Sequence, residues 1–371
     1  MDDRIYYRES ITLGRKYDVT VIGRGHCDQI KFSNKIKLIY LSSPTCVILH
    51  LALLLRAFMA LVREKPKLIQ CHEPDTLVIS RLAASVSRGK VRVVYDVHEH
   101  YPSLWSDRTH LPRAVRDLIA VGIDLCERSL SKGVDAVLVV SESVGSRFRH
   151  VRPGAIVIAN YPWRSACRDT LDVPAGVTTA ALPIVLYAGS VDEKRGISQF
   201  LMALKSVREF FPNVRFVVLG SLTAKRTLCS DICSFLRRNR LEQNFQIKPW
   251  LPYFEYYRSL SEATVGVVLF LPTIFNNIVA LPNKLFDYMG AGVPVVASNF
   301  PEIRKIVKGS GCGFLVDTTK PGEIAAAIVK LISDPELAAS LGRRGHRAVM
   351  EHYNWESQEE RLLAAYERLC E

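Results

Sequence analysis

The chain has 371 residues, 48% of them hydrophobic and 23% charged, which is more than one core usually supports and enough for two domains. Its nine cysteines lack the spacing of a zinc knuckle or a redox motif, and no charged leader with an apolar core opens the sequence, so we expect a protein of the reducing cytosol. The longest apolar run, 46–62, contains His50 and Arg56 and is shorter than the roughly 20 residues that cross a bilayer, which favours a buried or interfacial helix.

Positive charge is concentrated in the first half of the chain. The formal net charge is +12: residues 1–165 hold 25 Lys and Arg against 16 Asp and Glu, an excess of 9, and residues 166–371 hold 24 against 21, an excess of 3. Such an excess favours an anionic partner, for example a phospholipid surface, a lipid diphosphate or a nucleic acid, although a merely solubilising surface explains it equally well. No stripe of interleaved aromatic and basic residues occurs, so we predict no nucleic-acid binding.

The first half alternates short β-branched runs with helical patterns. The runs predicted as strands are 19–22, 39–41, 68–71, 91–96, 136–140 and 156–158. This alternation predicts βαβ units around a parallel sheet. We expect an N-terminal domain over 1–165, followed by a linker over 166–182, where Pro, Gly, Thr and Ala dominate and the periodicity is lost.

The same alternation restarts in the second half. The predicted strands are 184–188, 215–219, 245–247, 265–270, 293–297 and 314–316. A second doubly wound domain is expected over 183–352. The helices predicted to close the chain lie near 321–333, 335–351 and 357–369. Asn354 or Ser357 is expected to cap the last one.

Polar residues follow two of the predicted N-terminal strands. They are His72 and Glu73 after one strand and His98, Glu99 and His100 after the next. Because ligands bind beyond the carboxyl ends of parallel strands, both groups are expected at one crevice. As a metal site they are weak, since His98 and His100 alternate faces in an extended chain. Contact with substrate and hydrogen bonding to local backbone both stay open.

The segment 187–196 combines a glycine turn with a cation. Gly189 and Ser190 end a predicted strand, and Arg195 stands just before a helix expected to start near Ile197. Backbone N–H groups at a helix start suit a phosphate, and Arg195 adds a fixed charge. Many strand-to-helix turns have this form without a ligand, so the pattern alone is weak.

The segment 280–298 predicts a loop, a short helix, a glycine turn and a buried strand. The helix is expected to begin near Asn283, where free N–H groups and Lys284 suit a second phosphate. Asp287 follows one turn later, where it can accept hydrogen bonds from ribose hydroxyls. A capped surface helix with one solvated aspartate is the alternative.

Several stretches of the chain together form a family pattern. They are 187–196, Leu219-Gly220-Ser221, 281–298, 313–316 and 353–356, with weaker matches at Asp3-Arg4 and Asp96-Val97-His98-Glu99. This succession resembles the family 4 retaining glycosyltransferases of the GT-B fold over nearly the whole chain. The resemblance implies two doubly wound Rossmann-like α/β domains facing a cleft. The domain over 1–165 would bind the acceptor, the domain over 183–352 a nucleotide-sugar donor, and the helix over 353–371 would pack back on the first domain.

The resemblance also implies a reaction and roles for named residues. A sugar passes from a nucleoside diphosphate to an acceptor with retention, without a cofactor or essential metal, and no Asp-x-Asp motif occurs. By similarity Arg195 and Lys284 stabilise the departing diphosphate, and His98 lies beside the donor sugar. The implied donor-binding residues are Gly189, Ser190, Gly220, Ala280, Leu281, Pro282, Asn283 and Asp287. The implied acceptor-side residues are His72, Glu73 and Glu99.

Three departures from the family pattern stand out. The usual pair of glutamates is incomplete, since Asp287 holds the second position and Val279 the first. Ser190 replaces the usual cation after the first glycine, which leaves more of the phosphate charge to Arg195. The first strand of the fold, at the centre of the N-terminal sheet, is missing, which predicts two strand edges without a partner. We interpret this as a start downstream of the true one, or as a truncated and inactive copy.

We therefore predict a cytoplasmic hexosyltransferase of surface-polysaccharide or lipopolysaccharide assembly. It would dock by its basic domain on the inner face of an anionic membrane and glycosylate a lipid-linked or carbohydrate acceptor. The run 46–62 with Arg63, Lys65 and Lys67 suggests the membrane contact. Alternatives are a nucleotide-sugar epimerase of similar architecture and a non-catalytic membrane-associated homologue. An NAD dehydrogenase is disfavoured, because no G-x-G-x-x-G follows a strand and opens a helix.

Overall fold

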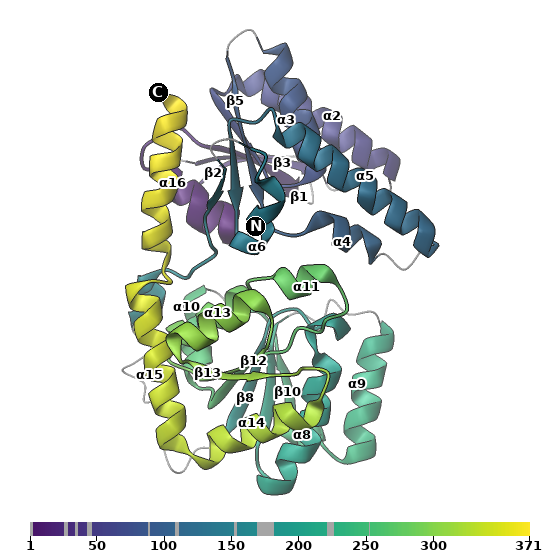
Figure 1. Cartoon of the computed structure of the whole chain (residues 1–371), viewed down its shortest axis with the longest axis vertical. Helices are drawn as coiled ribbons and strands as arrows, with labels where there is room; N and C mark the ends of the chain where they lie inside the picture. The colour runs from purple at the N-terminus through teal and green to yellow at the C-terminus, as the bar shows by residue number, and fades with distance from the viewer. Residues whose placement is uncertain are drawn as a thin grey trace. The chain divides into compact units, whose positions relative to one another are not determined.

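The chain folds into two compact units, which are described one at a time. Unit 1 comprises Met1–Asn160 and Ser357–Glu371, and unit 2 comprises Tyr161–Glu356 (Figure 1). The computed structural model describes residues 3–25, 29–33, 36–42, 47–87, 90–107, 111–151, 154–168, 182–220, 226–251 and 253–371. Cys46, Ser221 and residues 169–181 of the predicted linker lie outside these ranges. Within them, no helix combines the length and the apolar character needed to span a membrane.

The strands of unit 1 form two separate sheets. In pairing order, the first sheet holds β1 (Thr20–Gly25), β3 (Ile36–Ser42) and β2 (Gln29–Ser33). In the same order, the second holds β4 (Leu68–Cys71), β5 (Arg92–Val97), β6 (Ala136–Val139) and β7 (Ala155–Val157). All pairs are parallel except β2 with β3, which is antiparallel.

A break separates the two sheets between β1 and β4. Among the described strands, each of these two pairs on one side only. The side chain of Arg24 on β1 lies 3.9 Å from that of Glu73, which stands two residues after the end of β4, so the two edges end close together. The gap predicted for the missing central strand corresponds to this break. On β4 itself, Gln70 donates to Glu9 Oε2 at 2.8 Å and accepts from the hydroxyl of Tyr366, near the other end of the chain.

Helices cover the sheets of unit 1. They are η1 (Asp3–Ser10, a π-helix), α1 (Ile11–Leu13), α2 (Val47–Glu64), α3 (Pro74–Val86), α4 (Tyr101–Ser106), α5 (Arg113–Ser131), α6 (Glu142–Gly145), η2 (Ser146–Phe148) and α16 (Trp355–Cys370). Helix α3 contacts α2 and α5 (Figure 1). Helix α16 buries Leu362 and Tyr366, and its Gln358 accepts from the backbone N–H of Ala159 at 3.0 Å. The last helix of the chain is therefore part of the unit that the first residues form.

Unit 2 is built on one six-stranded parallel sheet. Its strands, in spatial order, are β10 (Phe245–Lys248), β9 (Arg215–Leu219), β8 (Ile184–Ala188), β11 (Val265–Val268), β12 (Val295–Ser298) and β13 (Gly313–Val316). The chain runs outward from β8 in one direction and from β11 in the other, so the strand order reverses between these two. In open sheets of this kind, ligands bind at the carboxyl ends of the strands beside that reversal.

Helices cover both faces of this sheet. They are α7 (Arg164–Arg168), η3 (Glu193–Arg195), α8 (Ile197–Phe210), α9 (Arg226–Asn239), η4 (Glu242–Asn244), α10 (Tyr253–Ser261), α11 (Phe275–Val279), α12 (Asn283–Gly290), α13 (Pro301–Ser310), α14 (Pro321–Ser333) and α15 (Pro335–Glu351). Along β8, Val185 and Tyr187 enter one core cluster and Leu186 and Ala188 the other. Burial on both faces explains the continuous apolar runs of these strands.

Among the differences from the sequence prediction, two concern the ends of the predicted domains. Residues 166–168 of the predicted linker are helical, because they complete α7. The closing helix α16 begins at Trp355, which places Asn354 directly before it. The Nδ2 of Asn354 donates to the carbonyl oxygens of Val349 and Met350, at 2.9 and 3.3 Å, and thereby also satisfies the end of α15.

Candidate functional site

The turn after the central strand β8 requires glycine at two positions. Gly189 has a φ of 121°, a conformation that residues with a side chain rarely adopt. Gly220 follows the neighbouring strand β9, and a Cβ placed on it would lie 2.1 Å from the carbonyl oxygen of Gly189. The backbones of the two strand ends therefore touch at the ligand-binding edge of the sheet.

The ammonium group of Lys284 is buried beside this turn. Lys284 on α12 is 8% exposed, and among the described residues its Nζ has no hydrogen-bond partner. The Nζ lies 4.1 Å from the centre of the Tyr187 ring and 3.8 Å from the place where a Cβ on Gly189 would stand. Burial, followed by the charge of Arg195, lowers the pKa of Lys284 to about 7. Because buried polar groups normally have partners, this amine is placed to receive an anion.

Arg195 supplies the second positive charge. It ends η3, where the carboxylate of Asp192 accepts from the backbone N–H of Lys194 at 2.8 Å. The next residue, Gly196, has a φ of 80°, and a Cβ there would lie 2.2 Å from the carbonyl oxygen of Leu269. The turn that carries Arg195 is thus pressed against the end of β11, on the other side of the strand reversal.

The other predicted donor-side residues lie next to these groups in the chain. Ala280, Leu281 and Pro282 form the half-buried loop between α11 and α12, and Asn283 is exposed at the first position of α12. The half-buried Ser190 follows Gly189 directly. Of the predicted donor-side residues, those that lie nearest to one another in the described structure are Gly189, Gly220, Lys284 and Arg195. Donor binding by the loop residues stays a prediction.

Asp287 faces a different neighbourhood. It is buried, and it accepts from the hydroxyls of Tyr256 at 3.0 Å and Tyr257 at 2.7 Å, one on each carboxylate oxygen. These bonds tie α12 to α10, a role that the sequence pattern does not reveal. Binding of ribose hydroxyls would have to use the remaining lone pairs of an enclosed carboxylate, and it stays a prediction.

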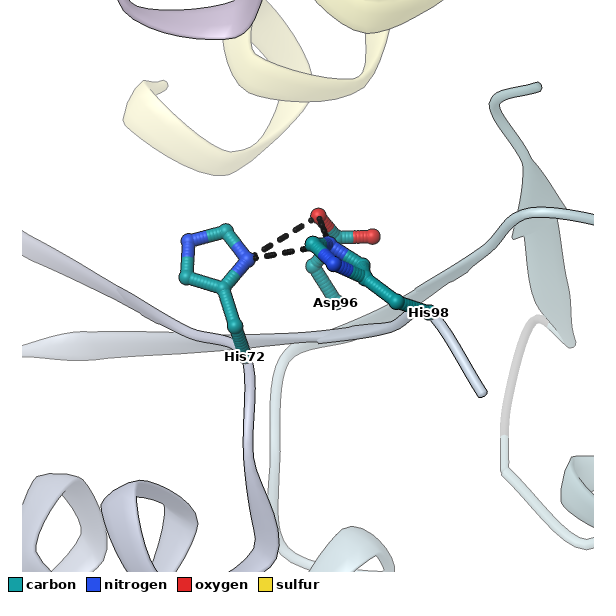
Figure 2. A group of neighbouring side chains, drawn as sticks. All are labelled: His72, Asp96 and His98. Atoms are coloured by element: carbon teal, nitrogen blue, oxygen red, sulfur yellow. Dashed lines mark hydrogen bonds and ion pairs between the residues drawn. The ribbon is translucent and has the colours of Figure 1, made fainter. Parts of the chain in front are cut away.

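In unit 1, three polar side chains meet at the ends of β4 and β5 (Figure 2). The Oδ2 atom of Asp96 lies 2.8 Å from Nε2 of His98 and 3.2 Å from Nδ1 of His72, and the two ring nitrogens are 3.2 Å apart. The strand register causes this meeting: Cys71 pairs with Tyr95, so the residues that follow them lie side by side.

Arg4 anchors the carboxylate of this cluster. Its Nε donates to Asp96 Oδ2 at 3.0 Å and its Nη2 to Oδ1 at 2.8 Å. Its Nη1 donates to the carbonyl of Ile158 at 2.7 Å and to Oδ1 of Asn160 at 2.9 Å. The Oε1 atom of Glu9 lies 2.8 Å from the Nε of the same guanidinium group. Arg4 and Asp96 are both buried, so this bidentate pair fixes the carboxylate between the two imidazoles.

The cluster shifts the pKa values of its members in different directions. Burial raises the pKa of Asp96, but Arg4 and the histidines more than offset it and hold that pKa well below its usual range. Burial lowers the pKa of His72, whereas for His98 the carboxylate of Asp96 outweighs burial and the pKa is raised. Burial raises the pKa of Glu9 to about 8. As the pH falls, His98 should therefore take up a proton at a higher pH than His72.

His72, Asp96 and His98 also resemble a metal site. They offer three ligand atoms within 4.8 Å of one another, and two imidazoles with a carboxylate suit Zn²⁺ and related ions. Arg4 opposes such an ion, because its Nε lies 3.0 Å from the Oδ2 atom that would bind the metal. The expectation that no metal is needed stays a prediction.

The remaining residues after these strands have local roles or lie at the surface. Glu73 is exposed at the residue before α3, and Glu99 is exposed after β5. His100 caps α4, since its Nδ1 accepts from the backbone N–H of Ser103 at 3.3 Å. Of the predicted acceptor-side residues, His72 is the one that joins His98.

The residues that hold this cluster in place are not among the predicted site residues, although Arg4 and Asp96 stand in two of the weaker family matches. Asp96 interrupts a β-branched run that is buried in the sheet, and a charge in such a run is itself a signal, because aspartate is rarely buried without a partner. Arg4 and Glu9 lie in a short N-terminal helix, where no local pattern marks them as buried.

Comparisons with known proteins cover both units. Residues 11–160 match the family described as Glycosyltransferase Family 4, and residues 182–334 match Glycosyl transferases group 1. The alpha-maltose-1-phosphate synthase of Mycolicibacterium smegmatis is 24% identical over 66% of this chain and 65% of its own length. The phosphatidyl-myo-inositol mannosyltransferase of Mycobacterium leprae is 23% identical over 54% of each chain. The matches thus span less than two thirds of the length of these relatives.

Solved structures share the fold of the whole chain. The sucrose-phosphate synthase of Thermosynechococcus elongatus superposes with a TM-score of 0.77 at 19% identity, covering 100% of this chain and 94% of the other. Anabaena HepE in complex with UDP superposes with a TM-score of 0.69 at 15% identity, covering 90% and 87%. HepE has also been solved with UDP-glucose. At these identities, the likeness establishes the architecture of two Rossmann-like domains.

Proposed function

Because the chain belongs to the family 4 glycosyltransferases of the GT-B fold, we propose that it transfers a sugar from a nucleoside-diphosphate sugar to an acceptor with retention at the anomeric carbon. Unit 2 binds the donor at the turn formed by Gly189 and Gly220. HepE, whose fold this chain shares, has been solved with UDP and UDP-glucose, which supports a nucleotide sugar as the donor.

The buried ammonium group of Lys284 carries this proposal. A cation without a hydrogen-bond partner is unfavourable inside a protein, and a diphosphate beside Gly189 would pair with it and with Arg195. As the bond to the sugar breaks, negative charge grows on the leaving diphosphate. Two fixed cations beside it lower the barrier, because they need no reorganisation at that moment.

His98 is our assignment for contact with a hydroxyl of the donor sugar. Its hydrogen bond to Asp96, which Arg4 holds in turn, fixes the orientation of the ring. The raised pKa of His98 makes it a ready hydrogen-bond donor. We assign no metal to the reaction.

We further propose that the acceptor is lipid-linked or a growing polysaccharide, reached at the inner face of an anionic membrane. The excess of 9 positive charges over residues 1–165 supports an anionic acceptor or surface. The similarity to a phosphatidyl-myo-inositol mannosyltransferase supports an acceptor of the same chemical kind.

Titration calorimetry of the full chain with UDP, GDP and ADP tests the donor site. We expect binding of one base class and an affinity at least roughly tenfold lower in Lys284→Met, since a charge-assisted contact contributes about 1.5–3 kcal/mol. Lys205→Met removes an exposed lysine of α8 and is the matched control. Equal affinity in Lys284→Met and Lys205→Met would refute the assignment of the phosphate site.

Retention is tested on the product. With the donor identified by calorimetry, the anomeric configuration of the transferred sugar follows from its proton coupling constants in NMR. An inverted product would contradict the retaining mechanism while leaving the donor site intact.

A further inference from the structure

Helix α2 of unit 1 turns an apolar face outward. Leu51, Leu55, Met59 and Val62 are between 38% and 64% exposed, and their spacing places them on one side of the helix. Leu53, on another side, is buried in the core. The helix is thus apolar on both sides, whereas a surface helix normally turns charged residues toward water.

The helices α3 and α5 repeat this inverted pattern. On α3, Val78, Leu82 and Val86 are exposed at intervals of four residues. The exposed aliphatic residues of α5 are Val115, Leu118, Val121 and Leu125. The buried side of α5 includes Glu127, which accepts from the hydroxyl of Tyr95 at 2.6 Å, so this helix buries a carboxylate and exposes its leucines.

The three apolar stripes lie on neighbouring helices. Helix α3 contacts both α2 and α5, and the three run beside one another (Figure 1). We call the eleven exposed residues named above the aliphatic face. Soluble monomeric proteins rarely expose a contiguous apolar patch larger than a few hundred Å², so a face spread over three helices indicates a binding surface.

Charge at the border of the aliphatic face indicates what covers it. Arg63, Lys65 and Lys67 are exposed at the end of α2, and no described residue forms an ion pair with them. Each acidic residue of the same helices has a basic partner within the chain: Glu64 pairs with Lys37, Asp75 with His50, Asp117 with Arg113, and Asp124 and Glu127 with Arg147. The border is therefore basic.

We propose that the aliphatic face docks on the surface of an anionic lipid bilayer. The aliphatic side chains would lie at the acyl boundary, with Arg63, Lys65 and Lys67 at the lipid phosphates. A second copy of the chain fits less well, because it brings the same basic border to a symmetric interface. The inference rests on the proposed function in that a lipid-linked acceptor is reached at such a surface.

Flotation of the full chain with lipid vesicles tests the proposal. We expect binding at low salt to vesicles of equal parts phosphatidylcholine and phosphatidylglycerol, and weak binding to phosphatidylcholine alone. The double variant Leu55→Ser/Leu118→Ser should bind the mixed vesicles at least roughly tenfold less, since two apolar anchors are lost. Both residues are more than half exposed, so the fold tolerates the change. Met202→Ser/Phe210→Ser on α8 of unit 2 removes two exposed apolar residues elsewhere and should bind normally.

Three outcomes overturn the proposal. The first is a wild-type chain that does not float with the mixed vesicles, and the second is a double variant that floats equally well. The third is a wild-type dimer in light scattering that Leu55→Ser/Leu118→Ser converts to a monomer, which would assign the face to a second copy. Calorimetry with UDP separates this inference from the donor site: loss of vesicle binding with intact UDP affinity supports the docking face. Vesicle binding by a wild-type chain without nucleotide affinity supports the face and refutes the donor assignment.

Discussion

At the scale of single residues, Lys284 should couple the proposed nucleotide binding to protonation. Its pKa is lowered to about 7 by burial and by Arg195, and a bound diphosphate would raise it again. Above pH 7 the free chain carries the neutral amine, and binding must then take up a proton. The affinity for the nucleotide should therefore fall as the pH rises from 7 toward 9, by up to roughly tenfold per pH unit.

Calorimetry in buffers of different ionisation enthalpy measures this proton uptake directly. In Lys284→Met the coupling should disappear, and the remaining affinity should depend little on pH in this range. A wild-type affinity that is constant from pH 7 to pH 9 would show that Lys284 does not contact the anion.

Glu9 should make the stability of unit 1 depend on pH. Its pKa is raised from 4.5 to about 8, so between these values the folded state binds a proton that the unfolded state has released. Stability contributed by Glu9 is fully present at low pH and falls through this window as the pH rises, by at most roughly 1.4 kcal/mol per pH unit. Glu9→Gln should abolish this dependence, because the amide does not titrate.

Urea unfolding of the wild type and of Glu9→Gln, at about pH 6 and about pH 8, tests this expectation. The variant should gain stability relative to the wild type at the higher pH. An identical loss of stability in both proteins would mean that Arg4 keeps Glu9 ionised, and that another group is responsible for the change.

At the scale of elements, the contact between the ends of β8 and β9 leaves no room for a side chain. Gly220→Ala would place a Cβ 2.1 Å from the carbonyl oxygen of Gly189, a backbone atom that cannot rotate away. We expect a loss of about 1–3 kcal/mol in the stability of unit 2, and weaker nucleotide binding because Gly189 is displaced.

Gly322→Ala on α14 is the control for this variant. No heavy atom lies within 4 Å of a Cβ at that position, and alanine favours a helix, so stability should rise by about 0.5–1 kcal/mol. Unfolding in denaturant and UDP affinity are measured on both variants. Equal stability of Gly220→Ala and Gly322→Ala would mean that the strand ends separate readily.

At this scale, the sequence predicts best the strands whose own residues form an apolar run. The strands β8 and β9 have the predicted bounds, because both faces of these strands are buried and the apolar run is nearly continuous. The strand β4 also has the predicted bounds, although Gln70 interrupts its apolar run. The sequence does not predict β2 (Gln29–Ser33), whose Ile30 is exposed and whose Lys31 faces solvent. This edge strand exists because β3 pairs with it, and pairing of this kind leaves no local pattern.

The residues of the candidate site also differ in whether a local sequence pattern predicts them. A glycine turn and nearby cations predict that Gly189, Arg195 and Lys284 are functional. The Nζ of Lys284 lies beside Gly189, and the functional role of the three residues stays a prediction. The ion pair of Arg4 with Asp96 joins residues 92 positions apart, so no local spacing reveals it. The bonds of the two tyrosines of α10 to Asp287 likewise depend on how two helices pack.

At the scale of the whole molecule, the last helix stabilises the first unit. Leu362 of α16 is fully buried, and Glu367 of α16 forms an ion pair with Lys16, near the start of the chain. Leu362→Ala should cost about 2–5 kcal/mol. Hydrogen exchange should become faster at β4 and β5 of unit 1 and stay unchanged at β8 and β9 of unit 2, since the units have separate cores.

Glu367→Ala provides the comparison for this experiment. It removes an exposed ion pair on the same helix, which should contribute little to stability because solvent screens it. Faster exchange in unit 2 as well as unit 1 of Leu362→Ala would mean that the two units unfold together.

The position of α16 also decides the order in which a ribosome completes the two units. Residues 1–160 emerge first, but Ser357–Glu371 follows only after all of unit 2 has been synthesised, a delay of roughly 10–40 s at common rates of translation. Throughout that delay, Gln70 lacks the hydroxyl of Tyr366, and the surface that α16 later covers is open to chaperones. The synthesis of unit 1 thus begins first and is completed last.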